Sequence, residues 1–105
     1  MRLEEIVNMN ALKGHISGMG ARHALTQARD AAFDLAVNET NKKEIQSMFN
    51  ICNQLNDAEL TDFRAMLAIE GIFAKLTEDN KHAFCSSMYP QLKNHTANDQ
   101  ATLVV

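Results

Sequence analysis

The run from Asp57 to Leu76 (DAELTDFRAMLAIEGIFAKL) constrains the fold most, because it is the most apolar stretch of the chain and has the length of a helix. At about 100° per residue, its apolar side chains cover well over half of a helical circumference. A surface helix needs a narrower apolar stripe, so we expect neighbours on most sides of this helix. Its cap is predicted at Asn56, with Glu59 three residues later. The opposite side is a narrow strip: Arg64, Ala68, Gly71 and Lys75.

The composition favours an all-α domain. The chain has 105 residues, of which 46% are hydrophobic and 22% charged, with one Pro and four Gly. A chain of this size buries roughly two thirds of its unfolded surface, which is enough for one core. So little Pro and Gly leaves few turn signals for a β fold. We predict a single compact all-α bundle of about five helices around the central helix 57–76. The helical domain spans 1–90, and the tail 91–105 is polar first and then apolar enough to dock on the body.

Apolar periodicity predicts the other helices, over residues 3–17, 21–37, 42–55 and 77–89. The first helix is apolar on two sides, which predicts either a kink near Asn8–Asn10 or two halves with different contacts, and leaves a dimer open. Asn41 with Glu44 predicts the cap of the third helix, and Thr77 predicts that of the last one. Pro90 is expected to end or kink the last helix.

The second predicted helix carries cations and an aromatic opposite its alanine-rich side. An aromatic side chain beside two arginines has the composition of an interface hot spot. The predicted partner-binding residues are Arg22, Arg29, Phe33 and Val37. The alternative is that Phe33 packs beneath another helix of the same domain, and nucleic-acid contact is a third interpretation.

A glycine-containing stretch before the second helix is the candidate anion site. No carboxylate occurs from Asn10 to Arg29, and glycine-rich backbone ahead of a helix can hold an anion. The predicted anion-binding residues are Lys13, Gly18, Gly20, Arg22 and His23. The stretch lacks the Gly-Lys-Ser/Thr of a phosphate loop, so the alternative is a turn that uses glycine for its backbone freedom.

Three further side chains are candidates for catalysis or for ligand binding. Glu70 falls within the apolar arc of the central helix, where a carboxylate needs a partner. We expect a structural ion pair with an Arg or Lys of another helix; an acid–base or ligand-binding role and partner binding are the alternatives. Cys52 and Cys85 lie on inner stripes, where thiols are generally inert. The chain has neither a Cys-x-x-Cys nor a pair of Glu-x-x-His segments. We predict no enzyme activity, no metal and no cofactor.

Charge and elimination lead to the predicted function. The formal net charge of −3 argues against a dedicated nucleic-acid clamp, and neither an apolar leader nor a membrane-spanning run is apparent. We therefore predict a small cytoplasmic protein-interaction module without membrane contact, acting as a regulator, adaptor or inhibitor of a larger protein, with a homodimer as a further option. The alternative is a helix-turn-helix-like, nucleic-acid-binding regulator, which would use these basic residues: Lys13, Arg22, Arg29, Lys42 and Lys43.

Overall fold

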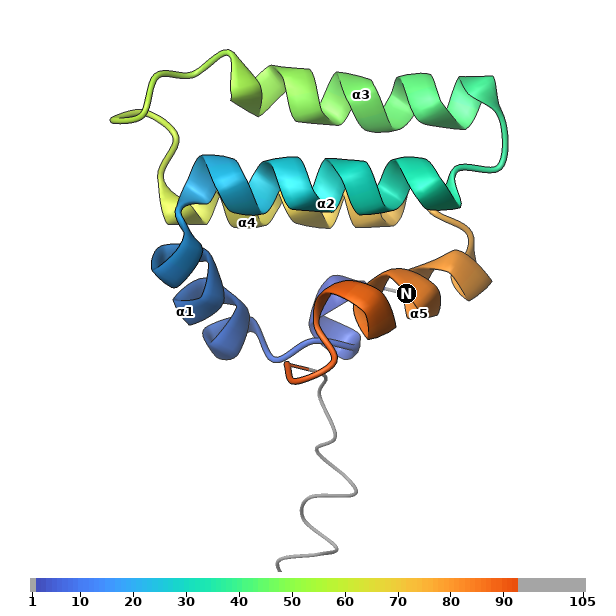
Figure 1. Cartoon of the computed structure of the whole chain (residues 1–105), viewed down its shortest axis with the longest axis horizontal. Helices are drawn as coiled ribbons and strands as arrows, with labels where there is room; N and C mark the ends of the chain where they lie inside the picture. The colour runs from blue at the N-terminus through green and yellow to red at the C-terminus, as the bar shows by residue number, and fades with distance from the viewer. Residues whose placement is uncertain (1, 93–105) are drawn as a thin grey trace, which may run out of the picture.

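The computed structural model describes residues 2–92 and confirms an all-α fold of five helices, with no strand in that range (Figure 1). A short 3-10 turn, η1 (Leu3–Glu5), precedes the helices. They are α1 (Met9–Met19), α2 (Ala21–Leu35), α3 (Glu39–Asn53), α4 (Asp62–Ala74) and α5 (Glu78–Met88). The predicted tail falls outside the described residues except for Gln91 and Leu92. The carbonyl of Leu92 accepts a hydrogen bond of 2.7 Å from the Asn8 backbone N–H.

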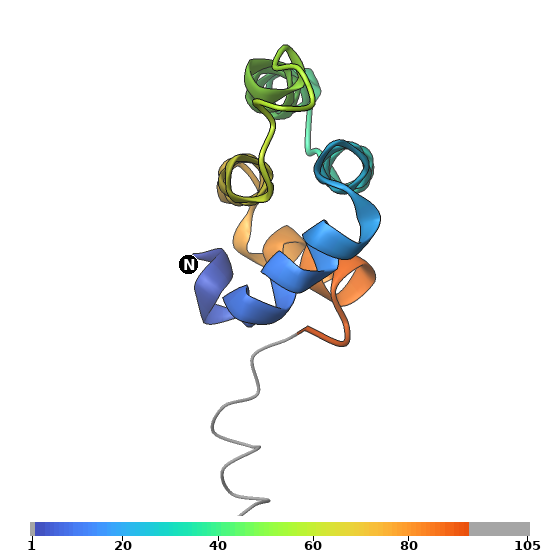
Figure 2. The ribbon, with the colours of Figure 1, turned by 90° about the vertical axis from the view of Figure 1, so that its left-hand side faces the viewer.

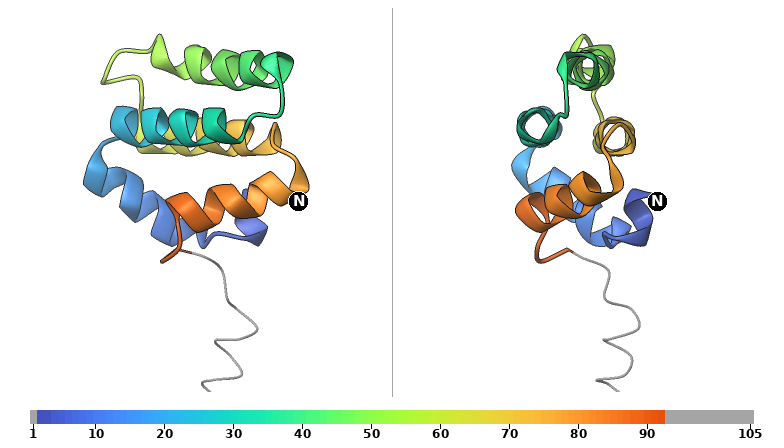
Figure 3. Two further views of the ribbon diagram at one scale, coloured as in Figure 1. Left: turned by 45° about the vertical axis from the view of Figure 1, so that its right-hand side comes forward. Right: turned by 90° about the vertical axis from the view of Figure 1, so that its right-hand side faces the viewer.

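Helices α2, α3 and α4 lie side by side at the corners of a triangle, and α1 and α5 cross beneath α2 and α4 on the side away from α3 (Figures 2 and 3). α4 contacts α1, α2, α3, α5 and η1, which confirms that it is the central helix. Its fully buried residues, Ala65, Ile69, Ile72 and Phe73, meet side chains of the surrounding helices in one core. The largest of these other side chains are Leu12, Ile16, Leu25, Ile45, Phe84 and Tyr89.

The predicted start of the central helix at Asp57 is wrong, because two cap signals compete in this segment. The Asn56 and Glu59 side chains do accept from each other's backbone N–H, at 2.9 and 3.2 Å respectively, but this pair closes a single turn. Thr61 then has an extended backbone (ψ 164°), and its hydroxyl accepts from the Arg64 N–H at 3.2 Å. α4 therefore begins at Asp62 and ends at Ala74.

The prediction of which side of this helix is least covered is also wrong. The strip that contains Ala68 and Gly71 lies against α3: Ala68 is buried, and the terminal methyl of Met48 occupies the space where a Cβ of residue 71 would project. Phe63 and Leu67, on the side expected to be buried, are instead 55% and 49% exposed. Small residues allow α3 to approach closely on one side, and nothing among residues 2–92 covers the other.

The starts of α1, α3 and α5 follow from the polar residue that caps each of them. Asn8 accepts from the N–H groups of Asn10 and Ala11, so the first predicted helix is divided into η1 and α1, which confirms the break there. Asn38, rather than Asn41, caps α3, and Thr77 caps α5 as predicted. The side-chain amide of Asn41 is therefore available to bind a different helix.

The C-terminal carbonyls of three helices are bound by side chains from other helices. Asn41 of α3 donates to the carbonyl of Lys75 at the end of α4, at 2.8 Å. Asn80 of α5 donates to the carbonyl of Leu35 at the end of α2, at 2.7 Å. Arg22 of α2 donates to carbonyls at the end of α3. Because the last carbonyls of a helix have no partner within it, these bonds satisfy groups that burial would otherwise leave unpaired.

Tyr89 gives the fold a built-in spectroscopic reporter, since it is the only tyrosine and the chain has no tryptophan. It is 1% exposed, with its ring edge-on to Phe84 and His15. Burial raises the pKa of its phenol above the ordinary value, and Cys85 acts in the same direction. A raised pKa means that the stabilisation is complete below about pH 10, the unfolded value, and is lost as the pH rises towards the folded value.

We therefore expect the tyrosinate absorbance to appear at higher pH in the native protein than in urea, and the free energy of unfolding to fall above about pH 10. Tyr89→Phe should remove the absorbance change and reduce this alkaline loss of stability. Equal titration midpoints in the native and urea-unfolded protein would contradict the assignment.

Candidate functional site

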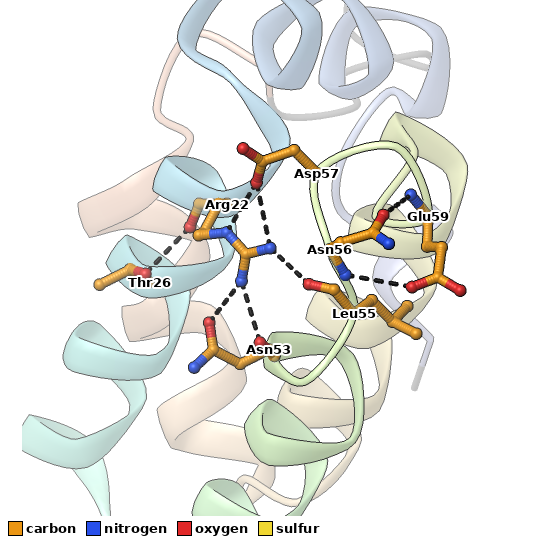
Figure 4. Close-up of polar contacts among 7 residues, drawn as sticks. All are labelled: Arg22, Thr26, Asn53, Leu55, Asn56, Asp57 and Glu59. Carbon is orange, nitrogen blue, oxygen red and sulfur yellow. Dashed lines mark hydrogen bonds and ion pairs between the residues drawn. The ribbon is translucent and has the colours of Figure 1, made fainter.

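Arg22, predicted to bind a partner or an anion, is held by the loop that connects α3 to α4 (Figure 4). Its Nη1 donates to the backbone carbonyl and side-chain oxygen of Asn53, at 3.0 and 2.9 Å, and its Nη2 donates to the Leu55 carbonyl at 2.5 Å. Asp57 completes the set, with its carboxylate 3.2 Å from Nε and 3.1 Å from Nη2. The guanidinium thus joins the start of α2 to the end of α3.

Arg29 and Phe33 also lie against α3, which corresponds to the alternative interpretation in which Phe33 packs within the domain. The Arg29 guanidinium carbon is 4.3 Å from the ring centroid of Phe49 and 5.4 Å from that of Phe33. Its nitrogens also contact the Asp30 carboxylate, at 2.7 Å, and the Gln46 side-chain oxygen, at 3.3 Å. Of the four predicted partner-binding residues, only Val37 is largely exposed, at 59%. Their role in partner binding stays a prediction.

An open, polar pocket of about 370 Å³ at the start of α2 contains part of the predicted anion site: Gly20, Arg22 and His23 line it, whereas Lys13 and Gly18 do not. Gly20, with φ +100°, makes the turn between α1 and α2, and Lys13, Gly18 and His23 are exposed. The fold adds two carboxylates that are distant in sequence: Asp57 lies on Arg22, and Asp62 accepts a hydrogen bond of 2.5 Å from the Ser17 hydroxyl. These carboxylates make the pocket less favourable for an anion, although anion binding itself stays a prediction.

The helix-turn-helix interpretation needs two helices that cross at a large angle, with basic side chains free on the second. Here α2 and α3 run antiparallel and side by side (Figures 1 and 2). Lys42 and Lys43 are exposed on α3, but Lys42 is 3.8 Å from the Glu39 carboxylate, and Arg22 and Arg29 have the intramolecular partners described above. No observation in the described part of the chain favours this alternative.

The side chains that could bind a metal ion or act as nucleophiles are dispersed over the fold. Within residues 2–92, no three His, Cys, Asp or Glu side chains are grouped to hold a metal ion. Cys85 is buried, and the half-buried Cys52 has its sulfur 4.0 Å from the Arg64 carbonyl oxygen. No helix in that range is long and apolar enough to cross a membrane.

The structure brings together an apolar surface that the sequence did not predict, on the outer side of α3 and α4. Ile51, Phe63 and Leu67 are 63%, 55% and 49% exposed, and they are three of the four large hydrophobic side chains that residues 2–92 expose. We call the surface formed by these three residues and the adjoining pocket the outer face. The pocket, of about 270 Å³, opens between α4 and η1 and is lined by Arg2, Leu3, Leu67, Glu70, Gly71, Phe73 and Ala74.

Glu70 lies in this pocket, and the ion pair expected for it is not formed within residues 2–92. Its carboxylate is half-buried, and the nearby Arg2 pairs with Glu4 at 2.5 Å instead. Arg64 on α4 and Glu44 on α3 are exposed and likewise take part in none of the ion pairs of the described residues. The outer face is therefore bordered by charges that no neighbouring helix compensates.

The sequence signal for this face was the all-round apolarity of the central helix, combined with the small residues of its opposite strip. α3 lies against that strip because Ala68 and Gly71 are small, and the bulkier side chains then remain uncovered. Searches of protein-family models, of curated proteins and of solved structures found no match to this chain.

Proposed function

We propose that this chain is a small protein-interaction module that acts as a regulator, adaptor or inhibitor, and that it binds its partner through the outer face of α3 and α4. The observation that carries the proposal is the exposure of Ile51, Phe63 and Leu67 next to an open apolar pocket. Isolated exposed hydrophobic residues are common, but several on two adjoining helices, next to an apolar pocket, favour an interaction surface.

The chemistry of the face supports protein rather than nucleic acid as the partner. Its centre is aliphatic and aromatic, and its border contains Glu44 and Glu70 beside Arg64. A nucleic-acid surface needs an excess of cations that contact phosphates. We also propose a cytoplasmic location, where the two free thiols, Cys52 and Cys85, would stay reduced.

A photo-crosslinking amino acid placed at Phe63 tests this function in the native host. Position 63 should yield cross-links to one or a few proteins, whereas position Ala83, exposed on α5 and outside the outer face, should yield few. Adding Leu67→Glu to the Phe63 probe should abolish the cross-links, because a buried unpaired carboxylate is costly. Equal yields at positions 63 and 83, or no cross-links at position 63, would overturn the proposal.

A further inference from the structure

The outer face has two unlike halves, which lie on either side of Leu67. The half towards the start of α4 is bulky and contains Phe63 and Arg64 on α4 and the exposed Ile51 on α3. Ile51 adjoins Cys52, whose sulfur is 4.0 Å from the Arg64 carbonyl oxygen. The half towards the end of α4 is hollow: the pocket is lined there by Glu70, Gly71 and Ala74, and its other charged residue, Arg2, is paired with Glu4.

Contacts between α3 and α4 fix which α3 residues border each half. The Cys52 sulfur lies near the Arg64 carbonyl, and the Met48 methyl lies near Gly71. The Asn41 amide binds the Lys75 carbonyl. Because residue numbers fall along α3 as they rise along α4, the two helices are antiparallel. Ile51 therefore belongs to the bulky half. Glu44 lies seven residues before Ile51, on the same side of α3, and borders the hollow half.

We infer that the outer face binds a second copy of this chain, in a two-fold symmetric dimer whose α4 helices are antiparallel and cross at Leu67. Phe63 and Gly71 are each four residues from Leu67. A two-fold axis at Leu67 therefore places the bulky half of one copy opposite the hollow half of the other. Phe63 of each copy then enters the pocket of the other copy. This inference rests on the proposed function, because it names the occupant of the same face.

Charge complementarity singles out this arrangement. The same axis brings Arg64 of one copy over the region between Glu70 and Glu44 of the other, twice per dimer. All three side chains lack an ion pair within residues 2–92, so the dimer supplies partners that the single chain does not. A symmetric interface requires such self-complementarity, with each contact occurring twice.

The size of the face sets the expected affinity. α3 and α4 contain 15 and 13 residues, so the face is roughly 20 Å long at 1.5 Å per residue and about two helix diameters wide. Such an area is at or below the ~800 Å² per partner of a stable interface, which places the dimer among weak complexes. We expect a dissociation constant of about 1–100 μM.

Sedimentation velocity of the full chain across this concentration range tests the dimer. The wild type should change from monomer to dimer. Leu67→Glu should remain monomeric because like charges then meet at the axis, and Phe63→Ala should weaken the dimer at least about tenfold. Ala83→Glu is the control, a change from an apolar to an acidic residue at an exposed position of α5 outside the face, and should dimerise as the wild type does.

A charge exchange provides the sharpest test and does not depend on loss of function. Arg64→Glu alone and Glu44→Lys/Glu70→Lys alone should each be monomeric, because each places like charges together. Their equimolar mixture should form a heterodimer, since both symmetric contacts are then attractive. A mixture that stays monomeric, or a wild type that stays monomeric throughout the range, would overturn the inference.

Different experimental results would contradict the dimer and the proposed function. If the wild type is monomeric but the probe at Phe63 still cross-links to another protein, the second copy is excluded as occupant and the interaction module stands. If the charge-exchanged pair dimerises but the only cross-links are to this chain itself, the dimer stands and the proposed role on a larger protein is lost.

Discussion

Replacement of Phe84 by alanine should destabilise the protein by about 3–5 kcal/mol, the usual loss for a fully buried phenylalanine. Phe84 is completely buried, and its ring lies between those of Phe73 and Tyr89, with centroids 6.2 and 5.9 Å away. It therefore joins α5 to the central helix and to the end of the domain. A domain of this size is typically stable by about 5–15 kcal/mol, so urea denaturation followed by circular dichroism should show a large shift of the midpoint.

Phe63→Ala is the matched control for this prediction, because it makes the same chemical change at a residue that is 55% exposed. We expect it to change the free energy of unfolding by less than about 1 kcal/mol. The comparison should be made at low protein concentration, so that self-association does not contribute to the apparent stability. Similar losses for the two variants would contradict the burial of Phe84 or the exposure of Phe63.

Arg22→Ala should cost about 2 kcal/mol, because it leaves the carbonyls of Asn53 and Leu55 without the charged donor that they share. Arg22→Lys should recover only part of this loss, since one ammonium cannot reproduce the fork of a guanidinium. The free energy of unfolding from urea titrations measures both effects.

Asp57→Ala separates the carbonyl contacts of Arg22 from its ion pair. The Asp57 side chain is 93% exposed, so its pairing with Arg22 is screened by solvent and should contribute less than about 1 kcal/mol. If Asp57→Ala proved as destabilising as Arg22→Ala, the ion pair rather than the helix-end carbonyls would be the main contribution of Arg22.

The sequence was sufficient to predict the helices and the central position of α4, because apolar periodicity reflects burial directly. It was less reliable for the ends, since local cap patterns can coexist. Asn56 and Glu59 form their reciprocal bonds, yet Thr61 starts the helix. Similarly, Asn38 and Asn41 are both suited to cap α3, and only the packing of Asn41 on the end of α4 decides between them.

The candidate site was harder to predict, for a physical reason. A helix that is apolar on most of its circumference does not indicate which part its neighbours will leave uncovered. That depends on how closely α3 can approach Ala68 and Gly71, which is a property of the packed domain. For the same reason, Arg22 and Arg29 look available in a helical wheel, while α3 and its following loop in fact engage them.

The side chains that bind helix ends have a consequence for how the domain opens. They connect residues 31 to 45 positions apart in the sequence, and each one belongs to a different helix from the carbonyl that it binds. Fraying, which normally starts independently at the end of each helix, is therefore tied to displacement of a neighbour. Excising α2, α3 or α5 would expose the terminus of another helix, so residues 2–92 should behave as one cooperative unit.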